Sequence, residues 1–68
     1  MKTTFSGYKI SMVADAPEER RADRAALKAV GADGVFRSEL AAQLELSMSG
    51  LDESRFYVAK TYAVQGVL

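Results

Sequence analysis

The sequence contains no cysteine, no histidine and no tryptophan, and only one proline. Without cysteine and histidine, the chain cannot form disulfides, zinc fingers or thiol nucleophiles. Only carboxylates, lysines, serines and tyrosines remain as candidate catalytic groups. Asp52 and Glu53 are adjacent and would diverge on a helix, so they do not form a facing acid–base pair. We therefore expect no enzyme, no metal site and no cofactor.

An excess of charge and a long apolar run are also missing. Nine Lys and Arg balance nine Asp and Glu, which counts against a protein that coats nucleic acid nonspecifically through phosphate contacts. No apolar run approaches the roughly 18 residues that a membrane span requires. The start, MKTTFSGYKISMVADAP, lacks the unbroken apolar region of a signal peptide. The sequence therefore predicts a cytoplasmic protein with no membrane partner.

The length of 68 residues predicts a single domain, residues 1–68, with a small core. A domain of this size buries only about 60% of the surface that its unfolded chain exposes. Disulfides, metals or association with another chain usually supplement such a core. Because the composition excludes disulfides and zinc fingers, we expect a homodimer or a larger assembly, with a monomer of well-formed helices as the alternative.

Local patterns predict a strand followed by two helices. Residues 3–14 alternate, with Tyr8, Ile10 and Met12 on one face, and Gly7 indicates a bulge or a close backbone approach. A first helix is expected between Asp15, as N-terminal cap, and Gly31, as the closing residue. Its apolar side comprises Ala22, Ala26, Leu27, Ala29 and Val30. Its charges, EERRADR, alternate in sign within one turn, which favours a solvated face over a phosphate-binding patch formed by Arg20, Arg21 and Arg24.

A second helix is expected over residues 38–48, with Ser38 as its cap and Leu40, Ala41 and Leu44 facing inward. The segment after it, LDESRFYVAKTYAVQGVL, fits two structures. Its length favours a helix from near Ser49, whereas its β-branched and aromatic residues favour a strand from Phe56. We prefer the helix and keep the strand as the alternative.

The stretch RSELAAQLELSMSGL resembles the helix-turn-helix of bacterial and phage transcriptional regulators. The matching positions are Leu40, Ala41 and Leu44 in the first helix, Leu46 and Ser47 around the turn, and Leu51 early in the second helix. The preceding DGVF resembles the short strand that leads into this unit in winged-helix proteins. The resemblance covers residues 35–56, about a third of the chain.

The resemblance implies a small α+β domain: an N-terminal strand, a helix-turn-helix-like corner, and a C-terminal helix or strand. It also implies sequence-specific binding to DNA, with the second helix in the major groove. The residues that would then lie nearest DNA are Ser47, Ser49 and Arg55, with Arg37 and Lys60 as phosphate contacts.

A second hypothesis is a non-enzymatic protein-interaction module, such as a phage-type inhibitor, adaptor or assembly factor. The zero net charge fits it, and Asp52 and Glu53 would repel DNA phosphates. Such a module would bind a protein partner through its apolar C-terminal segment or through an unpaired edge of the N-terminal strand. The contact residues of that segment would be Phe56, Tyr57, Tyr62, Val67 and Leu68, although the aromatic ones also suit a core. A third hypothesis is a module whose partner is another copy of itself, with assembly as its function. All three hypotheses remain open at this point.

Overall fold

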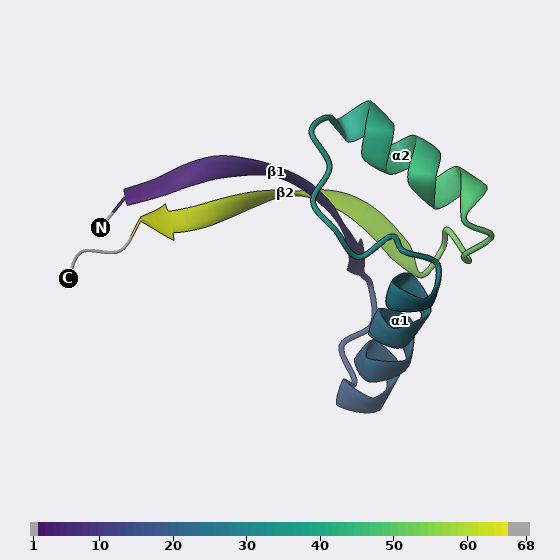
Figure 1. The fold of residues 1–68 in the computed structure, drawn as a ribbon. Coiled ribbons are helices and arrows are strands. Elements are labelled where there is room, and N and C mark those ends of the chain that lie inside the picture. The colour runs from purple at the N-terminus through teal and green to yellow at the C-terminus, as the bar shows by residue number, and fades with distance from the viewer. Residues whose placement is uncertain (1, 66–68) are drawn as a thin grey trace.

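The computed structural model describes residues 2–65, and the side-chain environments of residues 4–62 within them. The elements in chain order are β1 (Lys2–Met12), α1 (Pro17–Ala29), α2 (Glu39–Met48) and β2 (Phe56–Gln65). The two strands form an antiparallel ribbon, and both helices lie at one end of it (Figure 1). The predicted α+β class, with a strand first and two helices after it, is confirmed.

The C-terminal segment is a strand, so the preferred helix from Ser49 was wrong and the alternative strand from Phe56 is confirmed. β2 pairs with β1 from Phe56, opposite Met12, to Gln65, opposite Lys2. At the start of this strand, Phe56 is buried and Tyr57 is exposed. β-Branched and aromatic residues favour a pleated, half-buried surface, and β1 offers this segment a ladder along its whole length.

A β-bulge at Ser6 interrupts the register of β1. Phe5 lies opposite Tyr62, and the next paired residue, Gly7, lies opposite Thr61. The extra residue moves Phe5 to the face that carries Tyr8, and the two rings meet edge to face with centroids 5.3 Å apart.

Gly7 allows a second segment to approach β1 closely, as the sequence predicted. Its φ of 150° is one that side chains with a Cβ rarely adopt. A Cβ at this position would lie 2.5 Å from Val35 Cγ1 and 2.6 Å from the Phe36 carbonyl oxygen. Phe36 forms an isolated bridge with Tyr8 on the outer edge of β1, so this segment pairs with the ribbon at one position.

The core lies where the helices meet the adjoining half of the ribbon. Its buried members are Ile10, Leu27, Ala32, Leu46 and Phe56. β1 contributes to it from the face that the alternation predicted, because Ile10 is buried and Met12 packs against the cluster.

The buried face of α2 is the opposite of the predicted one. Ala42 and Leu46 are buried, whereas Leu40 is 69% exposed, Leu44 is 53% exposed and Ala41 is also exposed. Positions two residues apart on a helix point in nearly opposite directions, at about 200°. Both faces of this helix carry apolar residues, and the tertiary packing buries the face that carries Ala42 and Leu46.

The second helix of the expected helix-turn-helix does not form within the described residues. α2 runs without a break through the expected turn to Met48, and residues 49–55 are turns that lead into β2. Ser49 closes α2 by donating its hydroxyl to the Leu46 carbonyl oxygen at 2.8 Å. Gly50 then takes a φ of 82°, a conformation that typically ends a helix. These two residues reverse the chain where the resemblance predicted a helix start.

The helix boundaries agree in part with the predicted caps. Ser38 caps α2 by accepting from the Ala41 N–H at 3.1 Å, and Gly31 has the left-handed φ of 73° expected after α1. The N-cap of α1, however, is Ala16 and not Asp15, and it makes no side-chain hydrogen bond. Pro17 immediately follows it and needs no partner for a backbone N–H.

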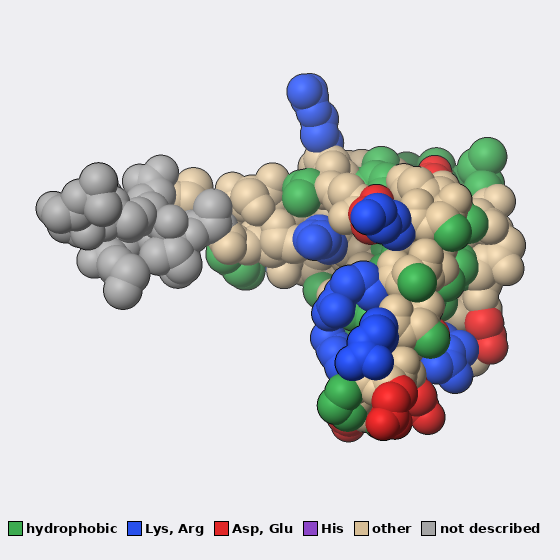
Figure 2. All heavy atoms as spheres, turned by 60° about the horizontal axis from the view of Figure 1, so that its bottom comes forward, with side chains coloured by type: hydrophobic (Ala, Val, Ile, Leu, Met, Phe, Trp, Pro, Cys, Tyr) green, Lys and Arg blue, Asp and Glu red, His purple; other side chains and the backbone are tan. Residues whose placement is uncertain are grey.

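The ribbon continues beyond the helices as an arm (Figure 1). The space-filling view shows the helical end as the wider part of the molecule (Figure 2). The Cα radius of gyration is 13.0 Å, compared with about 11 Å for a compact domain of this length. No helix among residues 2–65 combines the length and the apolar character needed to cross a bilayer.

Candidate interaction surfaces

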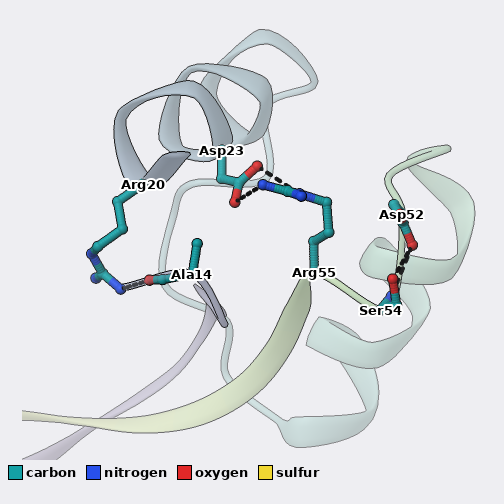
Figure 3. Close-up of polar contacts among 6 residues, drawn as sticks. All are labelled: Ala14, Arg20, Asp23, Asp52, Ser54 and Arg55. Atoms are coloured by element: carbon teal, nitrogen blue, oxygen red, sulfur yellow. Dashed lines mark hydrogen bonds and ion pairs between the residues drawn. The ribbon is translucent and has the colours of Figure 1, made fainter. Parts of the chain in front are cut away.

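Arg55, the residue expected to contact DNA, is a structural residue that joins two parts of the fold (Figure 3). Its guanidinium donates to both carboxylate oxygens of Asp23 on α1, from Nε at 3.1 Å and from Nη2 at 3.0 Å. Its backbone carbonyl accepts from the Val13 N–H at 2.9 Å, just after β1. The hydrogen bonds to Asp23, and the charge of the same carboxylate, raise the pKa of Arg55.

Asp23 was expected on a solvated face and is instead buried, at 6% exposure. The pair connects positions 32 residues apart. Nothing in the local sequence distinguishes Asp23 from the other charged residues of α1, so no sequence signal could have identified it.

The other residues proposed to contact DNA do not form one surface. Ser47 is exposed in the last turn of α2, and Ser49 caps the end of that helix. Arg37 precedes the start of α2, at the opposite end of a helix about 15 Å long. Lys60 lies on the ribbon, opposite Tyr8.

Asp52 organises the turn between α2 and β2. Its carboxylate accepts from the Ser54 hydroxyl at 2.6 Å and from the Ser54 N–H at 3.0 Å (Figure 3). These hydrogen bonds lower the pKa of Asp52. Its negative charge therefore stabilises the turn between α2 and β2.

The residues proposed to contact a protein partner fall into three groups. Phe56 is a core residue at 5% exposure and is not part of the surface, because the even-numbered face of β2 turns toward the helices at this end. Tyr57 and Tyr62 are 50% and 56% exposed, on opposite faces of β2. Val67 and Leu68 lie outside the described residues.

An aromatic surface covers one face of the arm. Phe5 is 47% exposed and Tyr62 is 56% exposed, and their rings meet edge to face with centroids 6.0 Å apart. Tyr8 extends this surface toward the helices through its contact with Phe5. We call these three side chains the aromatic patch. Exposed aromatic side chains are enriched at protein–protein interfaces because they bury a large area with little loss of entropy.

The outer edge of β2 is unpaired. Within residues 2–65, β2 pairs with β1 alone. Tyr8 exchanges both of its backbone hydrogen bonds with Phe36, at 2.9 and 2.7 Å, so its N–H and C=O groups point away from β2. In an antiparallel ladder the opposite residue, Lys60, then points its own N–H and C=O groups away from β1. The same alternation directs the backbone groups of Val58 and Tyr62 outward along β2.

Edge strands are commonly protected by proline, by several charges or by a bulge. β2, with the sequence FYVAKTYAVQ, has a single charged residue, Lys60, and no proline, and the bulge of the ribbon lies in β1. The outer edge of β1 differs, because Phe36 occupies it at Tyr8. The sequence hypothesis of a free N-terminal edge thus applies better to β2.

An apolar stripe also lies on the outer face of α2, where Leu40, Leu44 and Met48 recur every four residues with exposures of 69, 53 and 81%. Sequence reasoning assigned two of these residues to the core.

Basic side chains gather where α1 adjoins the ribbon (Figure 2). A hollow of about 300 Å³ there is lined by Lys9 from β1 and Arg24 from α1, with Asp33 as an acidic member. Arg21 and Lys28 are exposed one turn before and one turn after Arg24. This surface could attract an anionic ligand or a phosphate backbone.

Comparisons of the chain with protein-family models, with curated proteins and with solved structures found no match. Among the residues that the structure describes, no three side chains of the metal-binding types come together. The candidate site is therefore defined by these surfaces alone.

Proposed function

We propose that the protein is an interaction module that binds a protein partner through the arm of its ribbon. The observation that carries this proposal is the unpaired outer edge of β2, which offers outward backbone groups at Val58, Lys60 and Tyr62. A partner strand would gain main-chain hydrogen bonds along this edge, and its side chains would contact the aromatic patch beside it.

Site-specific photo-crosslinking in the native host tests this proposal. A photoreactive benzoylphenylalanine replaces Tyr62 on the arm in one variant and Arg21 on α1 in a matched control, since both side chains are exposed. We expect protein adducts from position 62 and none from position 21. Absence of any protein adduct at position 62 would contradict the proposal.

DNA binding by a small regulator is a second candidate, and the basic side chains around Lys9 and Arg24 favour it. If the protein binds DNA, the phosphate backbone lies against α1 and β1, and not along the second helix of a helix-turn-helix. Fluorescence anisotropy with duplexes from the upstream region of the gene, at low and physiological salt, tests it. Binding that weakens steeply with salt, stays tighter than for random duplex and is lost in Arg24→Glu would favour the regulator.

A further inference from the structure

We infer that the partner at the β2 edge is a second copy of this chain, whose β2 pairs antiparallel with the first about a twofold axis. This inference rests on the proposed function, since it names the occupant of the same edge. The resulting dimer would contain one continuous four-stranded antiparallel sheet, in the order β1–β2–β2–β1.

The direction of the backbone groups restricts how two copies can pair. Only even-numbered residues of β2 point their N–H and C=O groups outward, so hydrogen-bonded pairs must join even-numbered positions of the two copies. The twofold axis therefore lies where one residue of β2 faces its own copy in the partner strand. It cannot lie midway between two successive residues. This condition leaves a small set of registers.

Charge selects among those registers. Lys60 is the only charged residue of β2, and an axis through Lys60 would place two ammonium groups directly opposite each other. An axis through Thr61 places Lys60 opposite Tyr62 of the partner subunit, where the ammonium group can lie over the phenol ring. It also overlaps residues 57–65 of the two strands, whereas an axis through Ala59 overlaps only 56–62. The structure thus favours the register centred on Thr61.

The remaining features are compatible with self-association. The formal net charge of zero produces no long-range repulsion between copies. In the Thr61 register, the aromatic patches of the two copies lie on the same face of the joined sheet, because Tyr62 of each patch belongs to a paired strand. Of the three rings in each patch only Tyr62 lies on the paired strand, and its contact with Lys60 of the partner subunit would add to the energy of the backbone pairing.

Sedimentation equilibrium and residue-resolved amide exchange of the purified full chain test the inference. We expect a dimer mass, and slow exchange of the outward amides of Val58, Lys60 and Tyr62 as well as of the inward amides of Ala59 and Thr61. A monomer at millimolar concentration would overturn it. So would a dimer whose outward amides exchange fast, because such a dimer must form through another surface.

Two variants examine the edge and the register separately. Lys60→Pro removes an outward N–H that makes no bond to β1, so the ribbon should survive while the dimer dissociates. Lys60→Arg, which keeps both the N–H and the positive charge, should remain dimeric. Tyr62→Lys places lysine opposite lysine at two symmetric positions, and we expect the dimer to dissociate about tenfold more readily. A Tyr62→Lys dimer as tight as the wild type would overturn the Thr61 register, and circular dichroism confirms that each variant is folded.

The outcomes also separate the two proposals. A monomer in which position 62 crosslinks to a different protein overturns self-pairing and leaves the interaction module intact. Fast exchange of the inward amides of Ala59 and Thr61 would show that the ribbon itself is not formed, and both proposals would then fail.

Discussion

Arg55 makes hydrogen bonds to three parts of the chain at the helical end of the molecule. Its guanidinium binds Asp23 of α1, its carbonyl oxygen accepts from Val13, and its N–H donates to the Asp52 carbonyl oxygen at 2.9 Å. The side chain is 44% exposed, whereas that of Asp23 is only 9% exposed. Removing Arg55 would therefore leave a buried carboxylate unpaired, whereas removing Asp23 would leave a guanidinium that water still reaches.

We expect Arg55→Ala to lower the Tm more than Asp23→Ala. Without Arg55, the buried Asp23 carboxylate is left without its partner, while Arg55 without Asp23 remains accessible to water. Thermal denaturation followed by circular dichroism measures both variants, with the double variant completing the cycle. Equal Tm values for the wild type and both single variants would show that the ion pair contributes nothing.

Asp52 should make the stability of the fold depend on pH in the acid range. Hydrogen bonds from Ser54 lower the folded-state pKa of Asp52, so its contribution is present above the ordinary aspartate value of about 3.9. That contribution is lost as the pH falls through the lower folded-state value. We expect Asp52→Asn to have a lower Tm than the wild type at neutral pH, with a difference that narrows in acid. A difference independent of pH would exclude the charge of Asp52 as its cause.

Gly7 should tolerate no side chain. Gly7→Ala places a methyl group against Val35 and the Phe36 carbonyl oxygen, and we expect it to destabilise the fold by about 1–3 kcal/mol. Gly34→Ala is the matched control, because its Cβ meets nothing within 4 Å and we expect a change within about 0.5 kcal/mol. Urea denaturation compares the two, and equal stability would mean that the segment at Phe36 does not pack on β1.

At the scale of the element, α2 presents two apolar faces and buries only one. Ala42 and Leu46 face the ribbon, and Leu40, Leu44 and Met48 face outward. The composition of such a helix does not decide which face is buried, because either face could pack against the core. The tertiary packing decides it.

The two faces of α2 predict opposite results for the same substitution. Leu46→Ala should cost about 2–5 kcal/mol, because Leu46 is 3% exposed and belongs to the core. Leu44→Ala should change the stability by no more than about 0.5 kcal/mol, because that side chain is 53% exposed. Urea denaturation curves of both variants provide the measurement. A larger loss for Leu44→Ala would mean that the outward stripe is covered in solution.

At the scale of the whole molecule, the ribbon supports the core and also carries the edge at which we infer self-association. It supplies the core with Ile10 and Phe56, and the same two strands continue as an arm away from the helices (Figure 1). A second copy on the edge of β2 would therefore stabilise the element that supports the helices.

We accordingly expect the Tm to rise with protein concentration. A dimer that unfolds to monomers is stabilised by mass action as the protein concentration rises. A hundredfold increase in concentration corresponds to about 2.7 kcal/mol of association free energy and should raise the Tm of the unfolding transition. The same series with Lys60→Pro serves as the control and should show no shift. A wild-type Tm that is constant over the series would contradict a dimer coupled to folding.

The sequence by itself determined those features whose signals are local. The alternation of Tyr8, Ile10 and Met12 predicted β1, and Ser38 and Gly31 marked helix ends that the structure confirms. Gly7 indicated the close approach to β1. Each of these depends on neighbouring residues and on backbone geometry, which the order of residues specifies directly.

Only the tertiary structure decided the features that depend on distant partners. The segment from Phe56 could form a helix or a strand until β1 supplied hydrogen bonds along its length. α2 could bury either of two apolar faces until Leu46 joined the core with Ile10 and Phe56. Asp23 and Arg55 are 32 positions apart, and their pairing follows from the chain reversal after α2. The free edge of β2 likewise exists because sheet formation pairs one side of a strand and leaves the other open.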